Sequence, residues 1–240
     1  MLSEKPWKPE AVLRLFTGVF LCVFAGVILM SAAHPVKPTD NNISIGRVVF
    51  AALSFQGAAL VLIWFFLRRH WTRWKEAFGF ANDWKHALLF GAIGAFLFLP
   101  IGFGLQWVSA ELMTRFNGPP AEQAAVKALS LVTNWSERMT LIVVTIVLAP
   151  IAEEMLFRGI LYPMIKQLGF PRLAWWGVSA LFAAIHFNLA IFPPLLVLAL
   201  LLTLLYERTN NLLAPIVTHS LFNAANFALF YLVYKSPAKL

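Results

Sequence analysis

The sequence predicts an all-α, polytopic integral membrane protein with about seven transmembrane helices, within a range of six to eight. Of its 240 residues, 60% are hydrophobic and only 12% are charged, whereas soluble domains have about 25% charged residues. Apolar stretches of roughly 20 residues, the length that crosses a bilayer as a helix, recur along the whole chain. Short amphipathic helices are expected at the membrane surface between them. This composition excludes disordered, collagen-like and disulfide-stapled proteins.

Residues 1–138 are expected to contain the first three spans, at 12–33, 48–67 and 87–108. A cleaved signal peptide is the alternative for the first, because basic residues precede it. Its apolar run is, however, longer than the roughly 7 to 15 residues of a signal-peptide core. Pro100 is expected to kink the third span, since proline cannot donate the helical hydrogen bond to the carbonyl four residues earlier.

Two connections are predicted to form short helices at the membrane surface. After the second span, Trp71, Trp74 and Phe78 recur at helical spacing beside charged residues, which is typical of a helix that lies among lipid headgroups. The long connection at 109–138 contains a second amphipathic stretch at 121–131, which we also interpret as a short helix.

Residues 139–234 are expected to form the functional core of a single membrane domain. Four spans are predicted there, at 139–168, 173–187, 193–206 and 212–234. Ionisable side chains lie well inside three of these four spans. Such residues are rare within membrane helices and mark functional sites by default.

The net charge of +8 would indicate a nucleic-acid partner only in a soluble protein. Here most of the 19 lysines and arginines lie near the predicted ends of spans. Cytoplasmic loops carry an excess of these residues, and the larger share falls inside when the N-terminus is cytoplasmic. We therefore expect a cytoplasmic N-terminus, the lipid bilayer as a partner and no nucleic acid. Cys22 is the only cysteine, so an internal disulfide is impossible.

Three charged residues interrupt the fourth span within six positions: Glu153, Glu154 and Arg158. Glu154 and Arg158 are four residues apart, so they lie on one helix face and are expected to form a structural ion pair. Glu153 points about 100° away and has no basic partner in its own helix. It is therefore the candidate general base.

Two further spans supply polar side chains at a similar depth. His186 lies in the fifth span, and His219 and Asn223 lie four residues apart in the seventh. At about 1.5 Å per residue, Glu153 and the two histidines fall within about 7 Å of one another in depth. We therefore expect the three spans to form one site.

These residue types support the hydrolysis of a peptide or amide bond. Glu153 and His186 can activate a water molecule, and His219 and Asn223 can donate hydrogen bonds to the developing oxyanion. A metal-dependent version uses the same residues, with Glu153, His186 and His219 as ligands of Zn²⁺ and Glu154 as the base. The spacing alone does not decide between the two versions.

Taken in order, these residues resemble the signature of the CPBP family, also called the Abi or CAAX protease and bacteriocin-processing family, which includes the type II CAAX prenyl endopeptidases. The family pattern is E-E-x-x-x-R, then F-x-x-x-H, then H-x-x-x-N or H-x-x-x-D. Here it is filled by Glu153, Glu154 and Arg158, by Phe182 and His186, and by His219 and Asn223. The resemblance implies a membrane-embedded endopeptidase in which these residues have the same roles. It favours water activation by glutamate without a metal.

The resemblance also implies a substrate class and a location. The substrate typical of the family is the C-terminal tripeptide of a prenylated CAAX protein, cut after the lipidated cysteine. Bacterial relatives are associated with bacteriocin immunity and with the processing of other membrane-associated peptides. A compact chain of 240 residues is similar to the bacterial members, which implies a bacterial cell membrane.

Two other classes of protein fit part of the pattern. In a proton-coupled transporter, intramembrane glutamate and histidine residues relay protons, but the spans show no repeat between two halves as many transporters do. A non-catalytic immunity or scaffold protein of the membrane would use the same fold to bind a partner. The convergence of acidic, imidazole and amide groups on three spans favours the endopeptidase.

Overall fold

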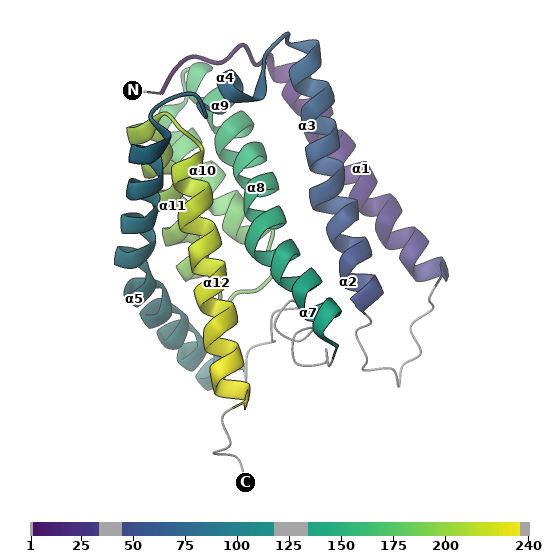
Figure 1. Ribbon diagram of the computed structural model, residues 1–240, viewed down its shortest axis with the longest axis vertical. Coiled ribbons are helices and arrows are strands. Elements are labelled where there is room, and N and C mark those ends of the chain that lie inside the picture. The colour runs from purple at the N-terminus through teal and green to yellow at the C-terminus, as the bar shows by residue number, and fades with distance from the viewer. Residues whose placement is uncertain (1, 34–44, 118–133, 236–240) are drawn as a thin grey trace.

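The computed structural model describes residues 2–33, 45–117 and 134–235. Within these residues every regular element is a helix, and most of the helices run side by side along the molecule (Figure 1). This confirms the predicted all-α, polytopic class. The amphipathic helix expected at 121–131 lies outside the described residues.

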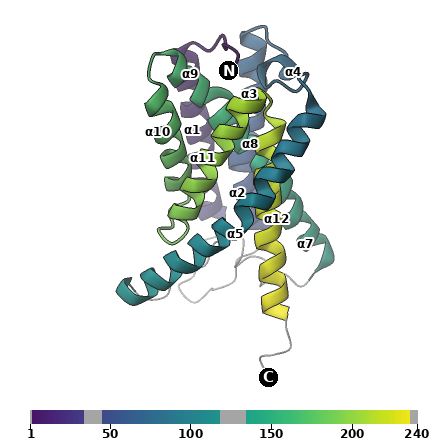
Figure 2. The ribbon, with the colours of Figure 1, turned by 90° about the vertical axis from the view of Figure 1, so that its left-hand side faces the viewer.

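Among the described residues, six helical runs are long and apolar enough to cross a membrane, in agreement with the predicted range. They are Pro9–Ala33, Val49–Arg69, Trp84–Phe116, Trp135–Gln167, Phe192–Thr209 and Leu213–Leu232. The fifth of the seven expected spans, 173–187, corresponds to helix α10 (Pro171–Ala184), which is not among these six because its 14 residues extend only about 21 Å at 1.5 Å per residue. With α11 (Phe192–Thr209) it forms a hairpin that ends short of the C-terminal end of α12 (Leu213–Lys235) along the bundle (Figure 2).

The N-terminal half is a pair of packed helical runs. The first is α1 (Pro9–Ala33), and the second consists of α2 (Ile45–Ala52), the π-helical turn η1 (Leu53–Gly57) and α3 (Ala58–Arg69). Gly26 lets the runs approach closely, because a Cβ atom there would lie 2.4 Å from Ser54 Oγ. The surface helix expected around Trp71 to Phe78 is a single turn, α4 (Trp74–Ala77).

Helix α5 (Trp84–Asn117) connects the two halves and lies against α11 and α12. Figure 2 shows that α5 is bent, and it contains Pro100, which removes one backbone hydrogen bond from a helix. Thr218 Oγ1 of α12 donates to the Gly91 carbonyl of α5 at 2.8 Å. A Cβ atom at position 91 would lie 2.6 Å from the Ala214 carbonyl oxygen, so glycine is what allows α5 and α12 to touch.

The fourth span is a continuous helical run with two π-helical segments. In order it consists of α7 (Trp135–Ile142), η2 (Val143–Leu148), α8 (Ala149–Glu154), η3 (Met155–Leu161) and α9 (Tyr162–Gln167). A proline follows each π segment within two residues, Pro150 after η2 and Pro163 after η3. Proline lacks the N–H for the carbonyl four residues earlier, and a widened π turn accommodates such an interruption. Turns of this kind are frequent at functional sites.

The N-terminal segment, residues 2–8, crosses one end of the bundle and joins its two halves (Figure 1). Trp7 Nε1 donates to the Gly159 carbonyl of η3 at 3.1 Å, a carbonyl to which Pro163 cannot donate. On its other side, the Trp7 ring packs against Phe66 of α3, with 5.1 Å between the ring centroids. Trp7 therefore links α3 to the span that carries the two glutamates.

Lys5 is buried in the same segment. Its ammonium group donates to Ser3 Oγ at 3.0 Å and to the Glu76 carbonyl at 3.4 Å. Burial lowers the pKa of Lys5, because loss of water disfavours the charged form. Among the described residues, the ammonium group of Lys5 has a hydroxyl and a carbonyl oxygen as hydrogen-bond partners, both of them neutral.

Candidate active site

Glu154 of α8 is the centre of a buried charge cluster. Its Oε1 atom accepts a hydrogen bond from Arg158 Nη1 at 3.0 Å and another from His219 Nδ1 at 2.9 Å. The side chains of Glu154 and Arg158 are 0% exposed, and that of His219 is 4% exposed. Arg158 Nη2 also donates to the Ala199 carbonyl of α11 at 3.1 Å. Helices α11 and α12 are thereby fixed to the span that carries Glu154.

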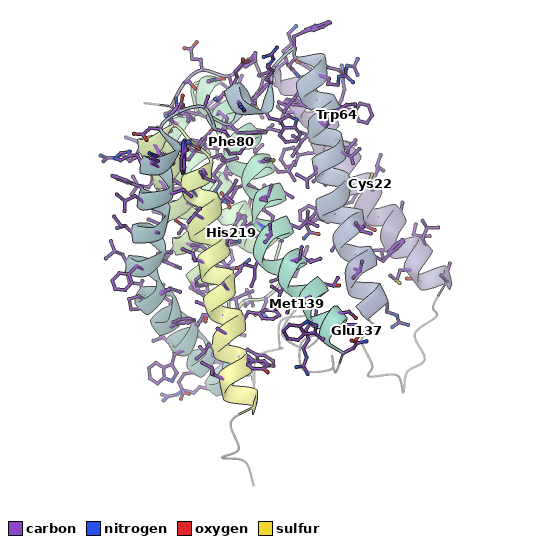
Figure 3. The ribbon with its side chains drawn as sticks, in the orientation of Figure 1. Cys22, Trp64, Phe80, Glu137, Met139 and His219 are labelled. Atoms are coloured by element: carbon purple, nitrogen blue, oxygen red, sulfur yellow. The ribbon has the colours of Figure 1, made fainter. Side chains whose placement is uncertain are left out.

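The Glu154 to Arg158 contact follows from their spacing of four residues along one helical run. The contact with His219 depends instead on how α12 packs beside α8. Figure 3 labels His219 on α12, alongside the run that carries both glutamates. A carboxylate that accepts charge-assisted hydrogen bonds from an arginine and a histidine is held in one position, so Glu154 orients the imidazole of His219.

Glu153 is also buried, with its side chain 10% exposed. Its Oε2 atom lies 3.9 Å from His219 Nε2, which is too long for a hydrogen bond but short enough for an ion pair. No other described residue forms a hydrogen bond with its carboxylate. One water oxygen can lie within hydrogen-bond distance of both Oε2 and Nε2. Unlike Glu154, Glu153 is available to exchange a proton.

Both predicted histidines are anchored through Nδ1. His219 Nδ1 bonds to the Glu154 carboxylate, and His186 Nδ1 lies 2.8 Å from the Phe182 carbonyl oxygen. A carbonyl oxygen only accepts hydrogen bonds, so His186 carries its proton on Nδ1 when it is neutral. Its Nε2 atom then has a lone pair that can accept a proton or orient a water molecule.

The aromatic ring of Phe182 connects the two histidines and the arginine. Its centroid is 5.1 Å from that of His186 and 5.6 Å from that of His219. The Arg158 guanidinium carbon lies 4.4 Å from the same ring centroid, which is cation–π distance. Phe182 is 0% exposed. The sequence pattern identified it only by its spacing from His186, whereas the structure places it at the middle of the cluster.

Asn223 lies one turn beyond His219 on α12 and is held by the fourth span. Its Nδ2 atom donates to the Thr145 carbonyl of η2 at 2.9 Å. The N–H of Ala149 bonds to the Val144 carbonyl, and Pro150 has no N–H, so Thr145 lacks both of its usual helical donors. The side-chain amide of Asn223 is the donor that this carbonyl receives in their place. A second N–H on Nδ2 remains for another acceptor.

The structure places His186 just after the end of α10 rather than inside the helix. The helix was expected to extend to residue 187, but it ends at Ala184. The N–H groups of His186 and Phe187 bond three residues back, to Ala183 and Ala184, which is the tighter pattern of a terminal turn. Phe187 has a φ of 49° and is 94% exposed, and this left-handed conformation ends the helix.

Neither Thr145 nor Ala199 was predicted to belong to the site. Each contributes a backbone carbonyl, and every residue has one, so residue type gives no signal. The sequence holds one clue to Thr145: Pro150, five residues later in the same helical run, has no N–H to donate to the Thr145 carbonyl. The role of Ala199 depends on the packing of α11 against Arg158.

The alternative set of metal ligands consists of Glu153, His186 and His219. In the described part of the chain, no three His, Cys, Asp or Glu side chains are placed to hold a metal ion together. Each histidine has its Nδ1 bonded, to the Phe182 carbonyl or to Glu154, so Nε2 is the nitrogen left for another ligand. The metal-dependent version with Glu153, His186 and His219 as ligands stays an alternative prediction.

Residues 134–225 match the family described as type II CAAX prenyl endopeptidase Rce1-like. We call the matching segment, residues 134–225, the Rce1-like domain. The Rce1-like domain includes all of the predicted site residues, from Glu153 to Asn223. The match confirms, for this part of the chain, the resemblance to the type II CAAX prenyl endopeptidases.

The uncharacterized protein YpbD of Bacillus subtilis (strain 168) is 36% identical to this chain over 77 residues. The match covers 30% of this chain and 36% of YpbD, so it spans little more than a third of that relative's length. No solved structure matches the chain.

Proposed function

We propose that the protein is a membrane-embedded endopeptidase that hydrolyses a peptide bond with water activated by Glu153. One observation carries this proposal. Of two adjacent buried glutamates, Glu154 is engaged by Arg158 and His219, whereas Glu153 faces His219 Nε2 at 3.9 Å with no hydrogen-bond partner among the described residues. The Rce1-like domain supports the class of enzyme.

The reaction begins with a water molecule between Glu153 and His219. Glu153 Oε2 takes a proton from this water as its oxygen attacks the peptide carbonyl carbon, and the carbonyl electron pair moves onto oxygen. When the intermediate collapses, the C–N bond breaks and Glu153 returns the proton to the leaving nitrogen. The products are a carboxylic acid and an amine, so every atom of the water is accounted for.

His219 and Asn223 are proposed to stabilise the oxyanion. Glu154 accepts from His219 Nδ1, so this role requires the imidazolium form of His219, the only form that also has an N–H on Nε2. The second N–H of Asn223, one turn further along α12, is the other donor. Preorganised donors of this kind contribute about 2.7 to 4 kcal/mol each. Glu154 and Arg158 act as positioning residues, because they orient His219 rather than contact the substrate.

His186 is proposed to orient the attacking water through the lone pair on Nε2. Its Nδ1 is fixed on the Phe182 carbonyl, and its ring lies against the Phe182 ring that also touches His219. Both histidines are close enough to Glu153 to interact with it electrostatically. This arrangement supports the role that the sequence assigns to His186.

The proposed substrates are prenylated CAAX-type proteins or other membrane-associated peptides. The name of the matched family supports the prenylated class, and a lipid-anchored peptide is already concentrated at the membrane in which the six apolar helices lie. The proposed location is a bacterial cell membrane with the N-terminus in the cytoplasm, supported by the excess of basic residues expected on that side.

The test compares Glu153→Gln with Glu111→Gln in purified protein reconstituted into liposomes. Glu111 is an exposed glutamate of α5, so the control makes the same chemical change away from the site. The substrates are a quenched fluorescent farnesylated CAAX peptide and its unprenylated counterpart. We expect Glu153→Gln to reduce turnover by about 10² to 10⁴-fold and Glu111→Gln to leave it within about twofold.

Wild-type turnover by a correctly inserted Glu153→Gln protein would contradict the proposal. Thermal unfolding of each variant shows whether the fold is intact. A parallel assay with a strong chelator, followed by addition of Zn²⁺, tests the metal-dependent alternative. Loss and recovery of activity in that assay would replace glutamate-only catalysis by a metal mechanism.

A further inference from the structure

A second polar region lies apart from the Rce1-like domain, between the start of α1 and the end of α3. It is a cavity of about 410 Å³. Three cationic side chains line it, Lys8, Arg14 and Arg69. Lys8 directly precedes α1, and Arg69 is the last residue of α3. The cavity therefore lies at the ends of two membrane-crossing runs, at the level where lipid headgroups lie.

The three cations of the cavity lack an acidic partner in the described part of the chain. None of them forms an ion pair with a described carboxylate, and all three are exposed. Three positive charges around one cavity attract a negatively charged group. Several arginine or lysine side chains around one cavity are typical of a phosphate site.

The remaining walls of the cavity are mostly apolar. They include Leu15 of α1 and Leu62 and Phe65 of α3. Phe65 is 53% exposed on the outer side of α3, where a membrane-crossing helix meets lipid. A ligand that matches this cavity therefore has an anionic head and a hydrocarbon tail. A soluble phosphate compound would use only the cationic part.

We propose that this cavity binds the headgroup of an anionic phospholipid, with the phosphate between Lys8, Arg14 and Arg69 and an acyl chain along the apolar wall. Basic pockets between transmembrane helices bind anionic lipid headgroups by the same chemistry. The neighbouring Arg68 lies over the Trp64 ring, with its guanidinium carbon 4.8 Å from the ring centroid. Figure 3 shows Trp64 on α3 near the same end of the bundle.

The proposed lipid would also lie next to the contact that joins the two halves of the protein. Phe66 and His70 line the cavity, and both pack against Trp7, with centroid distances of 5.1 and 5.5 Å. Trp7 in turn donates to the Gly159 carbonyl. Occupation of the cavity is therefore expected to stabilise the docking of the N-terminal segment.

The test measures lipid binding to the purified full-length protein in detergent by native mass spectrometry. Dioleoyl phosphatidylglycerol is titrated against dioleoyl phosphatidylcholine, which has the same acyl chains but no net charge. The cavity variant combines three charge-removing substitutions: Lys8→Gln, Arg14→Gln and Arg69→Gln. The matched control removes the same charge from exposed residues at the same end of the bundle: Arg73→Gln, Lys75→Gln and Lys85→Gln.

We expect the cavity variant to bind phosphatidylglycerol at least about tenfold more weakly than the wild type, and the control to stay within about twofold. Leu62→Trp, which fills the apolar wall and keeps all charges, should also weaken binding. Equal binding by the cavity and control variants, or equal binding of the two lipids by the wild type, would overturn the proposal. Displacement of phosphatidylglycerol by millimolar inorganic phosphate would show that a soluble phosphate is the ligand, and would overturn it as well.

Discussion

The two polar regions of this protein differ in whether their charged side chains are paired and buried. In the Rce1-like domain, Glu154 is neutralised by Arg158 and His219 within the chain, and these side chains are almost completely buried. In the cavity beside α1, the cations are exposed and have no acidic partner among the described residues. Charges that are paired inside the chain fix the positions of reacting groups, whereas charges without a partner can receive a ligand from outside.

Two ion pairs with the same spacing along a helix differ in burial. Glu154 and Arg158 are four residues apart with 3.0 Å between the bonded atoms, and Glu111 and Arg115 are four residues apart with 2.9 Å. The first pair is 0% exposed on both sides, while the second is 69% exposed at the arginine and 47% at the glutamate. Geometry is nearly equal, so the comparison isolates the effect of burial.

The largest effect is expected for Arg158→Leu. The substitution leaves Glu154 buried without its cation, and such a loss costs about 3 to 5 kcal/mol. The matched control Arg115→Leu should cost less than about 1 kcal/mol, because exposed pairs contribute little. The measurement is the unfolding of each variant in detergent, followed by circular dichroism. Equal losses for the two variants would show that burial does not distinguish the pairs.

The next largest effect is expected for Trp7→Phe, at the contact between the two regions. Phenylalanine keeps an aromatic ring against Phe66 but removes the N–H that serves the Gly159 carbonyl. An unsatisfied buried carbonyl costs about 1 to 3 kcal/mol. Trp135→Phe is the control, because Trp135 is 70% exposed. A Trp7→Phe protein as stable as this control would mean that the hydrogen bond contributes nothing.

The smallest effect concerns Lys5, which combines burial with the lack of an acidic hydrogen-bond partner. Its pKa is lowered by burial, so as the pH rises toward the ordinary lysine value of 10.5, the unfolded chain holds more protons at this residue than the folded chain. Stability should therefore rise with pH in that range. Lys5→Met should abolish this rise.

Chemical denaturation at pH 7 and at pH 10 measures this difference for the wild type and for Lys5→Met. The exposed Lys75 provides the control, and Lys75→Met should keep the wild-type dependence on pH. If Lys5→Met also keeps it, the buried ammonium group is not its source.

Much of the fold could be predicted from the sequence because crossing a bilayer requires long apolar helices. Composition and apolar run lengths predict the all-α class and the range of span numbers. The two π-helical segments of the fourth span could not be predicted in the same way, since they depend on how Pro150 and Pro163 are accommodated in three dimensions. The early end of α10 depends on the left-handed conformation of Phe187, which its residue type does not suggest.

The candidate site, like the fold, could be predicted only in part from the sequence. Contacts within one helix follow from spacing, as with Glu154 and Arg158. Contacts between helices do not, because a helical period gives the angle between Glu153 and Glu154 but not which of them faces α12. The structure turns Glu154 toward His219 Nδ1 and leaves Glu153 opposite Nε2. The central position of Phe182 depends likewise on the packing of α10.

The hydrogen bond from Trp7 to Gly159 joins residues 152 positions apart. At a synthesis rate of about 5 to 20 residues per second, roughly 8 to 30 s separate the making of the donor from the making of its acceptor. During this time Trp7 has the rings of Phe66 and His70 to pack against, but the Gly159 carbonyl does not yet exist. A chain whose translation stops before residue 159 lacks the acceptor of this hydrogen bond. Trp7 can therefore form this hydrogen bond only after the helix with both glutamates has been made.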